Sequence, residues 1–531
     1  MACVGAPLHA QLRVVTYNTA TGQNPGTQTA RPITATVLEA IADEIVGGIS
    51  KPIDVLLLQE QFSMQVTAQS FVDMLNGIYG AGTYARSTLN GLTSDPQARA
   101  GRPGLVYNTQ TVQLIGETMF GNVGTGSTQQ PRSTLRYQLR PVGYDDSADF
   151  YAYSSHWVSD TGSIPNSRRL AQAQSTRADA DALGDGAHLI YVGDFNIQTS
   201  SGTAYQHMLS AGNGQAFDPI NTPGSWHDNS SFKAIHTQSP ASVSQFDGQT
   251  LGGMDDRLDF QLVSGELLDD EGMGYITGSY RAFGNNGTHD CCNGAITSGT
   301  GAAPAVLTAL MQASDHLPVV ADYHIPAKMG VEIAAIPLTV TLGATVSLGV
   351  TVSNVAPVVA VNGADELDYT LSVMGNLSGG ASGIDAALGF GNTHQVTLDT
   401  STLGLKSGVI TVSSSSQAAA NALVNIPVNF EVIAEFAAAD FNEDGVVDGD
   451  DLAAWETGYG NGIDKENGDA DLDGDVDGAD FLVWQRQVTA GGAVAATGSV
   501  PEPAALWLAM CGACAAWRWT RSISPRSVTG G

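Results

Sequence analysis

Short apolar runs alternate with polar loops through the first 325 residues, and polar side chains stand at the ends of these runs. Runs of this length and apolar content predict β-strands. Four of them cover residues 12–18, 54–60, 150–156 and 188–196, and they end in Asn18, Glu60, His156 and the pair Asp194 and Asn196. A fifth run has Asp259 near its start, and Asp315 and His316 directly precede a last strand. The pattern therefore predicts candidate functional side chains at strand ends.

A second kind of pattern begins near residue 331. Residues 338–341, 346–352, 395–398, 408–412 and 426–430 are short runs rich in β-branched residues, with alternating apolar and polar positions. Turn residues recur roughly every ten positions, as is typical of a β-sandwich. No cluster of polar functional residues interrupts these runs, so we interpret this region as a spacer or adhesion module.

An acidic repeat follows. Between Asp440 and Asp480 the chain has fifteen Asp or Glu and one Lys. Two twelve-residue frames place oxygen donors at positions 1, 3, 5, 7, 9 and 12, with Gly at position 6, which is the spacing that wraps a Ca²⁺ ion. The frames consist of Asp440, Asn442, Asp444, Val446, Asp448 and Asp451, and of Asp469, Asp471, Asp473, Asp475, Asp477 and Asp480. Position 12 is Asp, where a regular EF-hand has Glu, and in this the pair resembles the dockerin domain. The resemblance implies Ca²⁺ binding and a cohesin-like protein partner.

The two ends of the chain have the features of export signals. Residues 1–10 are apolar and end on a small residue, which indicates either a signal-peptide remnant or an ordinary N-terminal extension. Near the other end, Pro501-Glu502-Pro503 precedes an apolar run from Ala504 to Trp517 and then a basic tail. About 14 helical residues are too short for a permanent membrane anchor. The arrangement resembles the PEP-CTERM sorting signal of exported bacterial proteins, which implies transient membrane association and an extracellular or cell-surface location.

The net charge and the cysteine content exclude some classes of protein. With 22 Lys and Arg against 53 Asp and Glu, the formal net charge is −31. This net charge argues against a protein that binds nucleic acid through overall positive charge. It does not exclude an enzyme that binds phosphate through a metal ion. Five cysteines do not make a disulfide framework. Cys291 and Cys292 are adjacent, so they form either a vicinal bridge or two free thiols.

Taken together in this order, the polar strand ends of residues 11–325 resemble the endonuclease/exonuclease/phosphatase family. The resemblance implies a four-layered α/β sandwich, in which two packed mixed β-sheets are flanked by helices. A β-sandwich domain and a small helical dockerin-like domain would follow. The expected divisions are a signal-peptide remnant at 1–10, the catalytic domain at 11–326, the β-sandwich at 327–435, the dockerin-like domain at 436–489 and the sorting signal at 498–521.

The family resemblance also implies a role for each motif residue. Glu60 would be the main ligand of a catalytic Mg²⁺ or Mn²⁺, with Asn18 beside it and Asp315 contributing, because hard cations prefer oxygen donors. His156 and His316 would face the phosphate, and Asp259 would orient His316. Asp194 would orient or deprotonate the attacking water, and Asn196 would donate a hydrogen bond to a phosphoryl oxygen. Either Asp194 or His316 could be the general base.

These expectations favour a secreted, metal-dependent phosphodiesterase of nuclease type. The alternatives are a sphingomyelinase-like phospholipase C, a phosphatase, or, in a different class, an inactive surface-binding protein that carries the dockerin module. An inactive protein would be expected to lack some of the metal-binding or catalytic residues of the family, whereas all the motif residues are present in this chain. Arg102, Arg132 and Arg136 are interpreted as solvated surface arginines rather than substrate contacts.

Overall fold

The computed structural model describes residues 11–21, 28–90, 102–121 and 131–488. It divides into two compact units, with the boundary between Ile433 and Ala434. Both the predicted signal-peptide remnant at 1–10 and the predicted sorting signal at 498–521 lie outside the described residues. Among the residues that the structure describes, none of the helices is long and apolar enough to cross a membrane.

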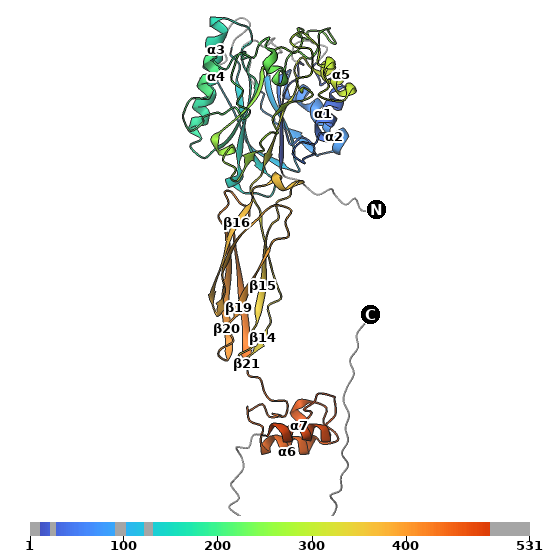
Figure 1. The fold of residues 1–531 in the computed structure, drawn as a ribbon, viewed down its shortest axis with the longest axis vertical. Coiled ribbons are helices and arrows are strands. Elements are labelled where there is room, and N and C mark those ends of the chain that lie inside the picture. Colours follow the sequence, from blue (N-terminus) through green and yellow to red (C-terminus); the bar gives the residue numbers. More distant parts are fainter. Residues whose placement is uncertain (1–10, 22–27, 91–101, 122–130, 489–531) are drawn as a thin grey trace, which may run out of the picture. The chain divides into compact units, whose positions relative to one another are not determined.

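Two mixed sheets form the centre of the α/β part of the first unit, with helices on their outer faces (Figure 1). The seven-stranded sheet has the order β10-β12-β1-β2-β4-β3, with β11 paired to β12. Its strands are β1 (Leu12–Asn18), β2 (Val55–Gln61), β3 (Tyr84–Arg86), β4 (Arg102–Asn108), β10 (Gly274–Tyr275), β11 (Arg281–Ala282) and β12 (Val319–His324). The five-stranded sheet has the order β5-β6-β7-β8-β9. Its strands are β5 (Val112–Phe120), β6 (Thr134–Pro141), β7 (Phe150–His156), β8 (His188–Asp194) and β9 (Asp259–Val263).

Alternation along the strands explains why these sheets pack in layers. In β1, Val14 faces the core between the two sheets, whereas Val15 faces helices α1 (Thr34–Asp43), α2 (Gln69–Tyr79) and α5 (Pro304–Ala313). On the far side, Tyr191 of β8 packs with α3 (Ser163–Ala182) and α4 (Thr203–Met208). Successive side chains of a strand point to opposite faces, so each sheet buries both faces. The result is the predicted four-layered α/β sandwich.

The β-sandwich that was predicted from the second pattern is present. One sheet has the order β13-β15-β19-β17, and the other has the order β14-β21-β20-β16-β18. The first consists of β13 (Met329–Ile333), β15 (Ser347–Asn354), β17 (Leu377–Ser378) and β19 (Asn392–Leu398). The second consists of β14 (Thr339–Thr341), β16 (Leu367–Gly375), β18 (Ala381–Asp385), β20 (Gly404–Ser414) and β21 (Leu423–Ile433).

The sandwich and the α/β layers share a packed junction. Ala356, Val358 and Ala364 belong to the same buried cluster as the core between the two mixed sheets. Backbone contacts reinforce this junction, since the Ile325 amide donates to the Gly363 carbonyl at 3.1 Å. The sandwich therefore adjoins the α/β layers through this junction, although it also has a hydrophobic core of its own around Val350, Ile410 and Val428.

The second unit is small and helical. Its two helices, α6 (Gly449–Gly458) and α7 (Gly478–Gln487), each follow one of the acidic loops. Asp448 and Asp477 cap these helices, and Asp451 and Asp480 complete a capping box in each. A capping box satisfies amides that a helix start leaves without partners, so the loop sequence itself specifies where the helix begins.

Candidate active site

The predicted motif residues meet where the two sheets end side by side. His156, Asp194 and Asp259 are direct cross-strand neighbours on β7, β8 and β9, so they occupy one row of the five-stranded sheet. Opposite them, Asn18 ends β1 and Glu60 lies near the end of β2, which is parallel to β1. Strands that are distant in sequence thus deliver five functional side chains to one edge of the molecule.

Backbone geometry at this edge is specialised. Glu60 has φ 52° and Asn196 has φ 52°, which are unusual conformations for residues other than glycine. Gly193 has φ 141°, and a Cβ at this position would collide with the Ser155 carbonyl oxygen. The glycine of the Gly-Asp-Phe-Asn motif is therefore needed for β8 to pair closely with β7.

Glu60, His156 and Asp194 form a buried group that could hold a metal ion. One ligand atom from each lies within 4.8 Å of the other two. Nε2 of His156 is 3.7 Å from the Glu60 carboxylate and 3.5 Å from Oδ2 of Asp194. Two carboxylates and an imidazole suit a divalent cation such as Mg²⁺ or Mn²⁺, with the imidazole more typical of Mn²⁺. This donor set therefore fits the cofactor that the sequence analysis expects.

Asn18 supports this group, and Asp315 lies outside it. Nδ2 of Asn18 donates to Oδ2 of Asp194 at 3.1 Å, and its Oδ1 accepts from the Ala20 amide at 3.1 Å. Oδ2 of Asp315 accepts instead from the Thr250 amide at 2.8 Å, while its Oδ1 is buried without a hydrogen-bond partner in the described part of the chain. The structure therefore brings Asn18 to Asp194 but does not place Asp315 among the clustered ligand atoms.

His316 and Asp259 form a close buried pair. Nδ1 of His316 is 2.7 Å from Oδ2 of Asp259, and both side chains are almost completely buried. This contact fixes the tautomer and directs Nε2 toward the cavity, where Gln238 lies 3.3 Å away. Oδ2 of Asp194 lies 3.8 Å from the same Nε2. Asp194 thus lies between the His316–Asp259 pair and the side chains of Glu60 and His156.

The two active-site histidines have opposite proton affinities. Burial alone would lower the pKa of His316, but the charges of Asp259, Asp194 and Asp315 raise the pKa of this histidine well above its usual value. Burial, together with Arg132 and His316, lowers the pKa of His156. His316 is therefore suited to carry a proton, and His156 is suited to act as a neutral ligand.

Asp194 has an intermediate proton affinity. Burial raises the pKa of Asp194 to about 7, with the charges of Asp259 and Glu60 acting in the same direction and His316 opposing them. Its Oδ1 accepts from the Asn196 amide at 3.0 Å. Nδ2 of Asn196 donates to the Trp157 carbonyl at 3.1 Å, which leaves its second N–H for another acceptor.

These residues line a cavity of about 770 Å³. Glu60, His156, Asp194, Asn196 and His316 are all on its wall, together with the mostly polar residues Ser159, Asp160, Asn166, Arg169, Thr199, Thr250 and Asp256. A small-molecule pocket with few apolar walls suits a charged or strongly hydrated substrate. The acidic Asp160 and Asp256 on the cavity wall disfavour a substrate that carries dense negative charge.

Sequence reasoning missed two supporting residues. Arg132 was interpreted as a solvated arginine, but its Nη1 donates to the carbonyls of His156 at 3.3 Å and Trp157 at 2.8 Å. Gln238 was not singled out at all. Its contact with His316 spans 78 residues of sequence, so no local motif could have revealed it. Of the other two arginines, Arg136 pairs with Asp179 at 2.6 Å and Arg102 donates to the Phe62 carbonyl, so both have internal partners.

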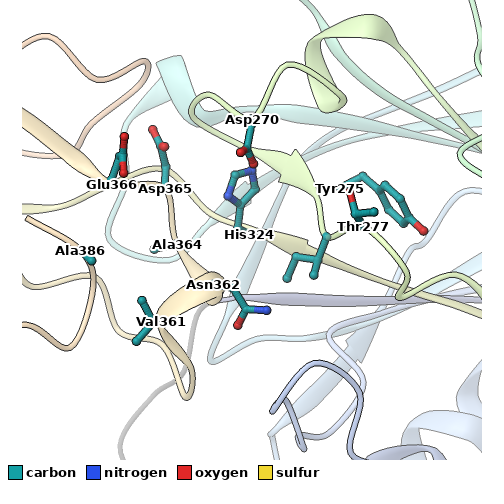
Figure 2. A pocket seen from close by; sticks show the side chains of 11 residues that line it. Asp270, Tyr275, Thr277, His324, Val361, Asn362, Ala364, Asp365, Glu366 and Ala386 are labelled. Atoms are coloured by element: carbon teal, nitrogen blue, oxygen red, sulfur yellow. The ribbon is translucent and has the colours of Figure 1, made fainter.

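A second cavity, of about 430 Å³, lies at the junction of the catalytic layers and the sandwich (Figure 2). Asp270, Tyr275 and His324 line it from one side, and Asn362, Asp365 and Glu366 line it from the other. Burial raises the pKa of Asp365 to about 7, although its carboxylate accepts from the Gly272 amide at 2.9 Å. None of the predicted site residues lies in this cavity.

The two acidic loops of the second unit are built alike. Gly445 and Gly474 have φ 91° and 92°, as the sharp turn at position 6 requires. Asp440 accepts from the Gly445 amide at 2.9 Å, and Asp469 accepts from the Gly474 amide at 3.0 Å. In the second loop, carboxylate oxygens of Asp469, Asp471 and Asp480 lie within 4.8 Å of one another, and so do those of Asp475, Asp477 and Asp480.

Comparisons with known proteins find structural neighbours only. No family model matches the chain, and no curated protein sequence matches it. The catalytic domain of human Nocturnin is 15% identical, with a TM-score of 0.36, and the match covers 60% of this chain and 96% of that one. An endonuclease/exonuclease/phosphatase from Bacteroides vulgatus is 16% identical, with a TM-score of 0.37 and coverage of 59% and 99%. A mannosyl-6-phosphatase from Bacteroides thetaiotaomicron is 16% identical, with a TM-score of 0.34 and coverage of 59% and 99%. Matches at these identities and scores do not assign an activity to the chain.

Proposed function

We propose that residues 11–326 form a divalent-metal-dependent phosphoesterase that hydrolyses phosphodiester bonds by in-line attack of water. The observation that carries this proposal is that His316, which is paired with the buried Asp259, and the Glu60–His156–Asp194 group line one polar cavity. Phosphoryl transfer needs positioning and charge stabilisation more than covalent chemistry. Both requirements are met by the residues that line this cavity.

Glu60, His156 and Asp194 would hold the Mg²⁺ or Mn²⁺ ion, with Asn18 fixing the orientation of Asp194. When bound, such an ion neutralises charge on the phosphoryl oxygens. Asp315 would take part in metal binding through a water molecule or after its side chain rearranges, because its buried Oδ1 has no hydrogen-bond partner in the described part of the chain and lies outside the Glu60–His156–Asp194 group.

The remaining residues have distinct roles in proton transfer. Protonated His316 would donate from Nε2 to a phosphoryl oxygen, with Asp259 stabilising its charge. Asp194, which reaches the cavity from the end of β8, would accept the proton of the attacking water. Asn196 would donate its unused amide N–H to a second phosphoryl oxygen. On this assignment Asp194 is the general base and His316 the proton donor.

The test is a substrate panel with the full-length protein in Mg²⁺ or Mn²⁺. It contains supercoiled plasmid, RNA, bis-p-nitrophenyl phosphate, sphingomyelin and inositol phosphates. We expect turnover of the phosphodiesters and a loss of activity in Glu60→Gln. Glu117→Gln is the matched control, since this carboxylate accepts from backbone amides of Thr88 and Leu89, outside the cavity wall.

Each outcome of the panel has a definite meaning. Hydrolysis of sphingomyelin but not of plasmid would replace the nuclease assignment with a phospholipase C, and hydrolysis of monoesters alone would replace it with a phosphatase. Failure on every substrate would overturn the enzyme proposal and favour a surface-binding protein. The strongly negative chain makes activity on short or small phosphodiesters more favourable than tight binding to long nucleic acid.

For the second unit we propose Ca²⁺ binding and recognition of a cohesin-like partner, and for the whole chain export to the cell surface or medium. Support for Ca²⁺ comes from the repeated oxygen frame and its two positive-φ glycines. Deleting residues 500–531 and fractionating the native host would test export, because a protein that keeps its location without this segment does not use it as an address.

A further inference from the structure

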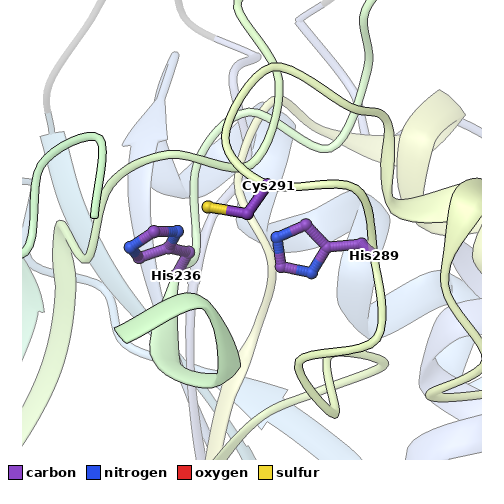
Figure 3. A group of neighbouring side chains, drawn as sticks. All are labelled: His236, His289 and Cys291. Carbon is purple, nitrogen blue, oxygen red and sulfur yellow. The ribbon is translucent and has the colours of Figure 1, made fainter. Parts of the chain in front are cut away.

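His236, His289 and Cys291 form a second cluster of ligand side chains outside the active site. The three side chains point toward one another, and one potential ligand atom from each lies within 4.8 Å of the others (Figure 3). His236 and His289 are 0% and 2% exposed, and Cys291 is half-buried. None of these residues has a role in the proposed hydrolysis.

The hydrogen bonds of His289 leave one nitrogen turned into the cluster without a partner. The Asn285 amide nitrogen donates to two backbone carbonyls, those of Lys233 at 2.7 Å and His236 at 2.9 Å, so its Oδ1 is an acceptor. Nδ1 of His289 lies 3.2 Å from this Oδ1 and must therefore carry the proton. Nε2 is buried and has no hydrogen-bond partner within the described residues. A lone pair in this position is characteristic of a metal ligand whose other nitrogen is fixed by an outer hydrogen bond.

His236 presents a similar mismatch. Its Nδ1 lies 3.1 Å from the Met254 carbonyl oxygen, and its Nε2 lies 2.9 Å from the Trp226 carbonyl oxygen. A neutral imidazole has one N–H, so only one of these contacts can be a hydrogen bond. The other nitrogen directs a lone pair at a carbonyl oxygen. A cation beside that nitrogen would remove this repulsion.

The cluster is held by ordered backbone. The Met254 amide donates to the Gly294 carbonyl at 3.1 Å, and the Gly294 amide donates to the Asp290 carbonyl at 2.9 Å. These contacts fix the loop that carries His289 and Cys291 against the segment that His236 contacts. Bond lengths of about 2.1 and 2.3 Å place the ligand atoms of tetrahedral zinc roughly 3.5 Å apart. The cluster would therefore tighten from its present spacing of up to 4.8 Å when a zinc ion binds.

In the structure, Cys291 is bonded to Cys292 as a vicinal disulfide. A disulfide sulfur is a poor metal ligand, whereas a thiolate is a strong one. We propose that reduction of this bridge opens a Zn²⁺ site formed by His236, His289 and the Cys291 thiolate, with water in the fourth position. An external dithiol supplies two electrons and two protons and is itself oxidised to a disulfide. The S–S bond breaks, and Cys291 then releases its proton to solvent as the metal binds. Two imidazoles and a thiolate are a typical donor set for zinc.

Co²⁺ is the probe of choice, because a thiolate–cobalt bond gives a sulfur-to-metal charge-transfer band in the near ultraviolet. The active-site group and the acidic loops contain no sulfur, so neither can produce this band. The full-length chain is used with Cys3→Ser, Cys511→Ser and Cys514→Ser, which removes the other thiols. We expect the band after treatment with a dithiol, its loss on adding one equivalent of Zn²⁺ per chain, and no band in the oxidised protein.

Two cysteine variants test whether Cys291, rather than Cys292, is the metal ligand. Cys292→Ser cannot form the bridge and leaves Cys291 free, so it should show the band without reductant. Cys291→Ser should show none under either condition, and His289→Gln should weaken Co²⁺ binding at least tenfold. Circular dichroism identifies any variant that fails to fold. The proposal is overturned if the reduced parent and Cys292→Ser both lack the band, or if Cys291→Ser retains it.

Discussion

Electrostatic surroundings, rather than residue type, separate the two histidines of the candidate active site. His316 is in contact with the Asp259 carboxylate at 2.7 Å, and nearby carboxylates raise the pKa of His316. His156 lies beside Arg132, and burial lowers the pKa of His156. Two residues of the same type thereby have opposite proton affinities, as the proposed hydrolysis would use them, one as a proton donor and the other as a neutral metal ligand.

The first prediction concerns the charged pair. His316→Ala should lower turnover by roughly 10²–10⁴, the usual effect of losing an acid–base group, and Asp259→Asn should lower it less because this residue orients His316. Steady-state kinetics on the best substrate of the panel measures both effects. His394→Ala is the matched control, since His394 lies on β19 of the sandwich, contacts Tyr369 at 2.7 Å and does not line the cavity. Equal rates for His316→Ala and the parent would remove His316 from the mechanism.

Among the elements, the end of strand β7 depends on a side chain from outside it. Arg132 donates to the carbonyls of His156 and Trp157, and Asn196 donates to the second of these from the neighbouring motif. These bonds fix the position at which β7 releases His156 into the cavity. Arg132 is thus a positioning residue that acts through the backbone of His156.

The second prediction follows from these contacts. Arg132→Met should lower kcat roughly tenfold to hundredfold, because a displacement of about 1 Å at a reacting group costs this much. KM should change less, since the cavity wall remains. Arg136→Met, which breaks the ion pair with Asp179, is the control and should leave kcat close to that of the parent. A larger effect on KM than on kcat would contradict a positioning role.

The success and failure of the sequence predictions have a physical cause at this scale. Strand ends such as Asn18, Glu60 and Asp194 were predictable, because alternating side chains and buried apolar runs leave a local signature. The layered fold came from the same signature combined with the family resemblance. The contacts of Arg132 and Gln238 were not predictable, because they join segments whose proximity is created only by the packed sheets. The bridge between Cys291 and Cys292 was one of two open alternatives, since adjacency alone does not decide oxidation.

At the level of the whole molecule, the acidic loops belong to a unit of their own, separate from the catalytic layers. Their carboxylates are crowded, and the charge of Asp473 raises the pKa of Asp475. Without a cation this repulsion opposes folding, and the proposed Ca²⁺ ions would neutralise it. The two proposed metal requirements of the chain should therefore be separable.

The third prediction tests this separation. Ca²⁺ should raise the protease resistance of residues 436–489 and leave hydrolysis in excess Mg²⁺ unchanged. Asp444→Ala combined with Asp473→Ala should abolish the protection and spare catalysis, whereas Glu60→Gln should do the reverse. Limited proteolysis and a rate assay on the same samples measure both effects. Loss of hydrolysis in the double loop variant would show that the two units are coupled.

The fourth prediction concerns the junction between the catalytic layers and the sandwich. Burial raises the pKa of Asp365 to about 7, above its value in the unfolded chain, so the folded state binds this proton more tightly. The stability that the protonated form contributes is present at pH 4 and is lost as the pH rises through 7. Asp365→Asn keeps an acceptor for the Gly272 amide and removes the titration. The urea concentration at which half of Asp365→Asn is unfolded should therefore rise, relative to that of the parent, between pH 5 and pH 8.

Glu332→Gln is the control for this measurement, because it removes a charge from an exposed position of β13 that does not line the junction cavity. Its midpoint relative to that of the parent should be similar at both pH values. A constant difference between Asp365→Asn and the parent across this range would show that Asp365 does not titrate within it.

The single row formed by His156, Asp194 and Asp259 has a consequence for how this chain can evolve. Inserting or deleting one residue within β7, β8 or β9 would turn the following side chains of that strand to the opposite face of the sheet. Such a change would remove a residue from the row, so we expect selection against it. The connection between β8 and β9, residues 195–258, is under no such constraint, yet it supplies much of the cavity wall. Descendants of this chain can therefore acquire new substrate preferences by changing the length of that connection, while the inherited chemistry stays in register.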